Sequence, residues 1–247
     1  MASRIIRVIT EGATERVVGI QLYDREVMSQ YATPKPQQWT SKYGSREGYE
    51  QVIGLMRKEH IIENLRASPQ KEQLLLLFDR EDARSSQARA ADIAAKLGLT
   101  FRSIKGFANL FEDDSAKLRV ILHVASPQIA GIHRYDFDGY ILQLLQGDRK
   151  QDIARTLLGD QVKTAPDLPD KLLRKAEQEM TELMESNGCP WTHAKSWLYA
   201  YITAFQFRQS HVWFAAEVIA QSPREELETV FAPLIHAWDL LAQGGSQ

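Results

Sequence analysis

The sequence contains a single cysteine, Cys189, among its 247 residues. One thiol cannot form an internal disulfide, and it excludes a zinc site built from several cysteines. No segment approaches the roughly 20 consecutive apolar residues that cross a bilayer, and the N-terminus lacks the apolar stretch of a signal peptide. We therefore expect a cytoplasmic protein without a membrane partner.

The sequence also lacks an excess of basic charge, since its formal net charge is −2 at pH 7. Proteins that bind nucleic acid are usually basic, so the total charge gives no such indication. A local basic strip remains compatible with it, because acids gathered around metal ions would mask that strip in the sum. Candidates for the strip, for each of which solvated surface is the simpler explanation, are Arg4, Arg7, Arg102, Lys105, Arg149, Lys150, Lys171, Arg174 and Lys175.

The first half of the chain alternates between strand and helix patterns. Residues 4–10 are rich in β-branched side chains, and residues 73–78 form a continuous apolar run of strand length. Such a run is typical of a strand buried on both faces. The order of elements predicts an α/β domain with a mainly parallel sheet flanked by helices. The other expected strands are 99–104 and 118–125, and the expected helices are 14–30, 45–67 and 85–98.

Strand patterns disappear after residue 135, and only helix patterns follow. Pro166 and Pro169 punctuate the region between the two halves. We expect two domains, an α/β domain over residues 1–148 and a helical region over residues 149–247 that packs on it. The expected helices are 136–146, 170–186, 192–209, 212–221 and 224–242.

Acidic residues follow both of the apolar strands in the first half. Glu11 and Glu15 come after the first strand, and Asp79, Glu81 and Asp82 come after the second. Neighbouring strand ends in a parallel sheet lie roughly 5 Å apart, so these carboxylates can converge. Converging carboxylates raise each other's pKa unless a cation neutralises them. Hard oxygen ligands without Cys or His predict a site for one or two Mg²⁺ or Mn²⁺ ions.

Each acidic segment also has a simpler explanation. A turn followed by a helix with an acid in its first turn would explain Glu11, Gly12 and Glu15, because the helix dipole favours that placement. The segment DRED after the second strand is, by itself, an ordinary polar loop. The pairing of two acid-tipped buried strands is what favours the metal site.

The two acidic segments resemble a known family. A strand followed by Glu-Gly-x-Thr-Glu, and an apolar strand that ends in Asp-x-(Asp/Glu), resemble the Toprim domain of topoisomerases, primases and nucleases. The fuller resemblance is to the Toprim nucleases of the OLD (overcoming lysogenisation defect) group and their small relatives that lack the ATPase. In those nucleases a further acid heads a later helix, and a lysine in the C-terminal helical part completes the site.

The second half of the chain offers a match for both of these residues. The segment YDFDGYILQLL places Asp138 at the position of the later acid, with Asp136 as a near alternative. The segment PWTHAKSWLYAYITAF places Lys195 at the position of the lysine. The chain departs from the family at Glu81, which has a longer side chain than the usual aspartate, so Asp82 is an alternative ligand. No Walker A motif is present, so the ATPase half of full-length OLD proteins is absent from this sequence.

The resemblance implies a metal-dependent nuclease that hydrolyses phosphodiester bonds, with Glu11, Asp79 and Lys195 as catalytic residues. Lys195 would stabilise the negative charge on the scissile phosphate. It further implies a role in antiphage defence beside a separate ATPase, with DNA placed ahead of RNA as substrate, and it allows a homo-oligomer. The implied metal ligands are Glu11, Glu15, Asp79, Glu81 or Asp82, and Asp138.

Two other functions remain open at this point. One is a Toprim ribonuclease that cuts RNA, such as a tRNA. The other is a non-catalytic subunit that keeps the fold and uses its aromatic C-terminal helices as an interface. Asp138 would then only favour the start of its helix, and Lys195 would be a lysine whose ammonium reaches solvent beside an apolar stripe.

Overall fold

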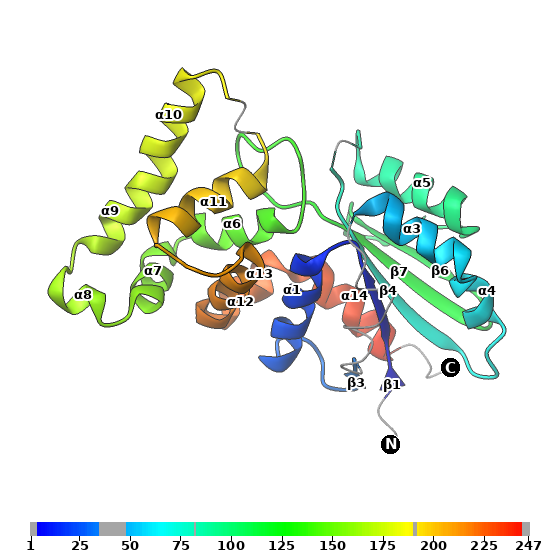
Figure 1. The fold of residues 1–247 in the computed structure, drawn as a ribbon. Coiled ribbons are helices and arrows are strands. Elements are labelled where there is room, and N and C mark those ends of the chain that lie inside the picture. Colours follow the sequence, from blue (N-terminus) through cyan, green and yellow to red (C-terminus); the bar gives the residue numbers. More distant parts are fainter. Residues whose placement is uncertain (1–3, 35–47, 82, 190–191, 244–247) are drawn as a thin grey trace. The chain divides into compact units, whose positions relative to one another are not determined.

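The computed structural model describes residues 4–34, 48–81, 83–189 and 192–243 (Figure 1). They form two compact units, one of Met1–Ser126 with Phe231–Gln247 and one of Pro127–Val230. This division differs from the expected boundary at 148/149, because the first helix after residue 135 belongs to the second unit and the last helix belongs to the first. None of the helices in the described ranges is long and apolar enough to span a membrane.

The first unit is built around a five-stranded sheet with the strand order β2-β4-β7-β6-β5. The three strands β2, β4 and β7 run parallel, whereas β6 and β5 are antiparallel to their neighbours. The predicted α/β fold with a mainly parallel sheet is therefore confirmed. The strands are β2 (Arg7–Thr10), β4 (Glu72–Phe78), β5 (Arg102–Ser103), β6 (Leu110–Asp114) and β7 (Leu118–Val124), and a separate pair is formed by β1 (Arg4–Ile5) and β3 (Ala32–Thr33).

Helices cover both faces of this sheet (Figure 1). The residues Leu74, Leu76 and Phe78 of β4 pack in one apolar cluster with residues of α3, α4 and α5. The alternate residues Leu75 and Leu77 face the opposite side, where α14 lies against β4 and β7. Burial on both faces explains the continuous apolar run of β4. The helices of this unit are α1 (Ala13–Asp24), α3 (Tyr49–Lys58), α4 (Ile61–Arg66), α5 (Ser86–Leu97) and α14 (Ala232–Gln243).

Some expected elements end elsewhere in the structure. The expected helix 45–67 is divided into α3 and α4 at His60, whose φ of 49° is left-handed and interrupts the helical hydrogen bonds. Residues 45–47 of that expectation lie outside the described residues. The expected helix 14–30 ends at Asp24, and β6 was not expected, because its sequence LFEDD carries three acids. The helix predicted at 85–98 is confirmed, with the Ser85 hydroxyl as its N-cap and Gly98 at its C-terminal end.

The second unit contains only helices among its described elements. The expected helix 170–186 is continuous from α9 through a π-helical turn to α10, whereas α7 and α8 were not predicted. The expected helix 224–242 is broken at Phe231, so α13 belongs to this unit and α14 to the first. The helices are α6 (Asp138–Gln146), α7 (Lys150–Leu158), α8 (Gln161–Thr164), α9 (Leu168–Arg174), η1 (Lys175–Glu179), α10 (Met180–Ser186), α11 (Ala194–Ala204), α12 (His211–Gln221) and α13 (Arg224–Val230).

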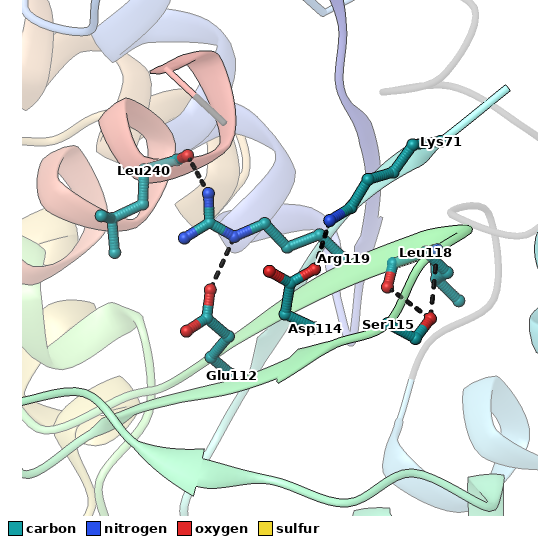
Figure 2. A network of polar contacts seen from close by, with 7 residues as sticks. All are labelled: Lys71, Glu112, Asp114, Ser115, Leu118, Arg119 and Leu240. Carbon is teal, nitrogen blue, oxygen red and sulfur yellow. Dashed lines mark hydrogen bonds and ion pairs between the residues drawn. The ribbon is translucent and has the colours of Figure 1, made fainter. Parts of the chain in front are cut away.

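Two side-chain contacts fix α14 to the rest of the first unit. The indole N–H of Trp238, which is fully buried, donates to the carbonyl of Ser29 at 2.9 Å. Arg119 of β7 donates to the Leu240 carbonyl in the last turn of α14 at 2.6 Å and pairs with Glu112 at 2.6 Å (Figure 2). The last four carbonyls of a helix have no partner within it, so Arg119 satisfies one of them and complements the negative end of the helix dipole.

We predict that Arg119→Met destabilises the protein by about 1–3 kcal/mol, because the substitution leaves a helix carbonyl and the Glu112 carboxylate without their donor. The matched control is Lys71→Met, which breaks the exposed ion pair of Lys71 with Asp114 in the same network (Figure 2). Surface pairs contribute about 0–1 kcal/mol, so this control should be nearly neutral. Urea unfolding of both variants measures the difference, and equal losses would contradict the tethering role of Arg119.

Candidate metal centre

The structure brings three of the predicted acids together at the carboxyl end of two adjacent parallel strands. Glu11 follows β2, and Asp79 and Glu81 follow β4. One carboxylate oxygen from each residue lies within 4.8 Å of the others, and they form the one such group among the described residues that could hold a metal ion. The expectation that the two acid-tipped strands are neighbours is therefore confirmed.

Backbone pairing determines this convergence. Thr10 stands opposite Leu77 in the parallel register of β2 and β4. The ladder continues one step further, since the N–H of Glu11 donates to the Leu77 carbonyl at 3.0 Å. The N–H of Asp79 then donates to the Glu11 carboxylate at 3.0 Å. The Glu11 side chain at the end of β2 thus accepts a hydrogen bond from the backbone at the end of β4.

The carboxyl group of Glu11 is buried in a cluster of like charge, with only 3% of the residue exposed. Burial raises its pKa from 4.5 to about 7, and the negative charge of Glu81 acts in the same direction. The N–H of Asp79, the charge of Arg89 and the backbone N–H of Tyr49 partly oppose this shift. Glu11 is therefore a group whose ionised form needs a further cation, as a metal ligand does.

Two helices begin beside the cluster and direct their positive ends toward it. The Gly48 N–H at the start of α3 donates to the Glu11 carbonyl at 3.1 Å. Helix α1 begins just after Gly12, and a Cβ added to Gly12 would lie 2.9 Å from the Glu15 carboxylate. A residue larger than glycine would displace Glu15, which is 2% exposed in the first turn of α1. The sequence Glu-Gly-x-Thr-Glu thus packs an acid against the backbone next to the strand end.

Glu81 adopts an unusual backbone conformation for its residue type. Its φ is +46°, in the left-handed region that L-residues other than Asn and Asp seldom occupy. The turn around it is closed by the Ala83 N–H, which donates to the Arg80 carbonyl at 3.0 Å. A left-handed residue costs roughly 1–2 kcal/mol, and such residues concentrate at functional sites.

Arg89 of α5 is a part of the site that sequence reasoning missed. Its guanidinium Nη2 donates to the Arg80 carbonyl at 3.0 Å and lies 3.8 Å from the Glu81 carboxylate. The same guanidinium lies 4.3 Å from the centre of the Tyr49 ring, and Lys96 lies 4.5 Å from that ring centre. An arginine in an alanine-rich helix gives no sequence pattern that separates it from solvated surface, so only the fold could find it.

The second unit brings together the two other predicted residues. The Lys195 ammonium lies 3.7 Å from the carboxylate of Asp138, which is 4% exposed at the start of α6. Asp136 is also buried, and its carboxylate lies 3.4 Å from Nδ1 of His193. The same Nδ1 accepts the backbone N–H of Lys195 at 3.1 Å. Burial, followed by the charge of Asp138, raises the pKa of Asp136 from 3.8 to about 7.

A glycine makes room for Pro127 beside the start of α6 in this second group. A Cβ on Gly139 would overlap Cγ of Pro127, whereas its distance of 3.5 Å from Cβ of Ala194 would be an ordinary van der Waals contact. Ala194 is the first residue of α11, directly before Lys195. The absence of a side chain at Gly139 therefore permits the close packing of Pro127 next to Asp138.

The remaining predicted ligands are placed as follows. Glu15 is buried beside Gly12 but is not one of the three acids whose oxygens lie within 4.8 Å of one another. Of the two alternative ligands after β4, Glu81 belongs to the cluster. Asp82 lies outside the described residues. Asp138 and Lys195 belong to the second unit.

Comparison of the chain with protein-family models, with curated proteins and with solved structures finds no match.

We predict that Glu11→Gln stabilises the metal-free protein at pH 8. Because the pKa of Glu11 is raised on folding from 4.5 to about 7, the folded state binds this proton more tightly than the unfolded state. That contribution is fully present below pH 4.5 and is lost as the pH rises through 7. The amide avoids the loss, which amounts to at most about 3 kcal/mol.

Melting temperatures of both proteins in a chelator, from pH 4 to pH 8, test this expectation. The gain of Glu11→Gln should be present at pH 8 and absent near pH 4. Glu63→Gln, at an exposed position of α4, is the control and should change stability by less than about 0.5 kcal/mol at either pH. A Glu11→Gln variant less stable than the wild type at pH 8 would show that the carboxylate has a structural role.

Proposed function

We propose that the protein is a metal-dependent phosphodiesterase of the nuclease type, with its metal centre at Glu11, Asp79 and Glu81. The observation that carries the proposal is the convergence of these three acids at the carboxyl end of β2 and β4. The carboxyl ends of the strands are where open α/β sheets bind their ligands. The cluster also contains a carboxyl group, Glu11, whose pKa burial raises to about 7, and groups with perturbed pKa values concentrate at functional sites.

The donor set suits Mg²⁺ or Mn²⁺. All three ligands are hard carboxylate oxygens, which these ions prefer, and no sulfur or imidazole ligand is among them. Ligands on opposite sides of an octahedral Mg²⁺ lie about 4.2 Å apart, because each bond is about 2.1 Å long. Oxygens within 4.8 Å of one another are therefore close to coordination distance before any ion draws them in.

The chain's own residues would then supply binding and orientation. The backbone N–H of Asp79 donates to the Glu11 carboxylate, so the Glu11 side chain is held at the strand end that carries Asp79. A bound divalent ion would activate the attacking water and neutralise charge on the scissile phosphate. The pKa of Glu11 near 7 implies that ion binding displaces a proton from this site at neutral pH.

The resemblance to Toprim nucleases of the OLD group extends the proposal to biology. It supports DNA ahead of RNA as the substrate, and a role in antiphage defence beside a separate ATPase. These extensions rest on the resemblance alone, because the chemistry of a site does not identify its biological role.

Incubation of the purified protein with plasmid, single-stranded DNA and tRNA, each with Mg²⁺, Mn²⁺ or a chelator, tests the activity. We expect metal-dependent cleavage that Glu11→Gln and Asp79→Asn each reduce by at least about a hundredfold. Glu63→Gln is again the control and should retain full activity. Cleavage that persists in the chelator, or in both site variants, would refute the proposal.

The role implied for Lys195 has its own test. If Lys195 stabilises charge in the transition state, Lys195→Ala should lower the rate of cleavage by roughly a hundredfold and leave Mn²⁺ affinity unchanged. The matched control is Lys150→Ala, which removes the partner of Glu177 in the same unit. An unchanged rate for Lys195→Ala would assign its pairing with Asp138 to the stability of α6 and α11 alone.

A further inference from the structure

We propose that Arg89 is a positioning residue that holds Glu81 in the geometry of a metal ligand. The inference rests on the proposed metal centre and assigns a role to a residue that the resemblance does not include. The guanidinium group of Arg89 contacts both the carbonyl of Arg80 and the carboxylate of Glu81, whose φ is left-handed.

The guanidinium of Arg89 lies beside the turn that carries Glu81. Its Nη2 donates to the Arg80 carbonyl, which belongs to the peptide that precedes Glu81, and it lies 3.8 Å from the Glu81 carboxylate. Arg89 therefore contacts both the backbone and the side chain of the segment that carries the ligand. A planar guanidinium can satisfy such a pair of acceptors, whereas the single ammonium of a lysine holds them less rigidly.

Glu81 has a left-handed backbone conformation that depends on its surroundings. Its φ of +46° is unfavourable for a glutamate, so the surrounding structure must maintain it. The Ala83 N–H closes the turn on the Arg80 carbonyl, and Arg89 donates to the same carbonyl. Both contacts hold the peptide orientation that directs Glu81 toward Glu11 and Asp79.

Arg89 is itself held in place by its neighbours on α3 and α5. The residue is only 9% exposed, and its guanidinium lies over the Tyr49 ring at 4.3 Å from the ring centre. Tyr49 is the first residue of α3, whose N-terminus adjoins Glu11. The Tyr49 hydroxyl donates to Asp92, one turn beyond Arg89 on α5. The arginine is thus fixed between α3 and α5, which explains how it can position another group.

A buried arginine at this position lowers the stability of the fold. Nε of Arg89 is buried and has no hydrogen-bond partner among the described residues. A buried donor without a partner is destabilising, so an apolar side chain would fill this space with less loss of stability. Replacing a buried ion pair by apolar residues is often neutral for stability. The role of Arg89 in positioning Glu81 explains why a buried arginine occupies this place.

The sign of the change in metal affinity separates positioning from plain electrostatics. If Arg89 acted only as a nearby positive charge, Arg89→Met would tighten Mn²⁺ binding, because a repelling charge is removed. If Arg89 positions Glu81, the same substitution weakens Mn²⁺ binding although the charge is gone. We expect Arg89→Met to raise the Kd for Mn²⁺ at least tenfold, and Arg89→Lys to raise it at least threefold.

Titration of the full-length protein with Mn²⁺, followed by the electron paramagnetic resonance signal of free Mn²⁺, measures these affinities without any assay of activity. The matched control is Lys96→Met, which removes the other cation over the Tyr49 ring. Lys96 pairs with Glu50 and Asp92 and has no contact with Glu81, so its Kd should change less than twofold. An Arg89→Met Kd that is unchanged or lower would overturn the proposal.

A double-mutant cycle tests whether Arg89 acts through Glu81. In a Glu81→Gln background, Arg89→Met should change the Kd less than twofold, because the group it positions no longer serves as a charged ligand. Independent, additive losses would overturn positioning through Glu81. If Arg89→Met fails to fold, Arg89→Lys carries the same cycle. If the wild-type protein binds no Mn²⁺, the proposed metal centre itself is refuted. If the wild-type protein binds Mn²⁺ and the Arg89 variants bind it with the same Kd, only the positioning role of Arg89 is refuted.

Discussion

The parallel pairing of β2 with β4 is the constraint on which the candidate site depends. Parallel strands end at the same edge of a sheet, so the register of Thr10 with Leu77 delivers Glu11 and Asp79 to one place. The Asp79 N–H, which lies just beyond the ladder, donates to the Glu11 carboxylate. An antiparallel pairing, or a register shifted by two residues, would leave the same acids roughly 7 Å or more apart along the strands. The convergence of the acids therefore follows from the order and register of the strands.

Buried acids of like charge repel one another, which is unfavourable for the folded state. The helix N-termini and the arginine beside them offset this repulsion only in part. The helix starts at Gly12 and Gly48 direct positive dipole ends toward the cluster, and Arg89 adds a full positive charge. Glu11 still has its pKa raised to about 7, because burial outweighs these contributions. The remaining imbalance is what a divalent cation would neutralise. Metal binding to such a site would therefore be coupled to folding.

Sequence reasoning predicted the elements whose signal is local and missed those that tertiary partners decide. The apolar run of β4 and the Ser85 and Gly98 ends of α5 are local signals, and both predictions are confirmed. The break at Phe231, which separates α13 from α14, has no local signal, since the apolar face of α14 gains its partner only when the chain returns to the sheet. In the site, Glu11, Asp79 and Glu81 were predicted because acids after buried strands are visible in sequence. Arg89 was missed because its role depends on where α5 lies.

Two arginines of the first unit show that similar contacts can serve different ends. Arg119 pairs with Glu112 and satisfies a carbonyl at the end of α14, where an unmet acceptor would weaken the packing of that helix on the sheet. Arg89 likewise donates to a carbonyl and approaches a carboxylate, but its carbonyl belongs to a strained turn and its carboxylate to the acidic cluster. Arg119 holds a regular helix whose own hydrogen bonds already favour it. Arg89 holds Glu81 in a backbone conformation that glutamate disfavours, so its contacts stabilise that conformation and add little to the stability of the fold. If the orientation of Glu81 had no role, an apolar residue could replace this buried arginine at little or no loss of stability.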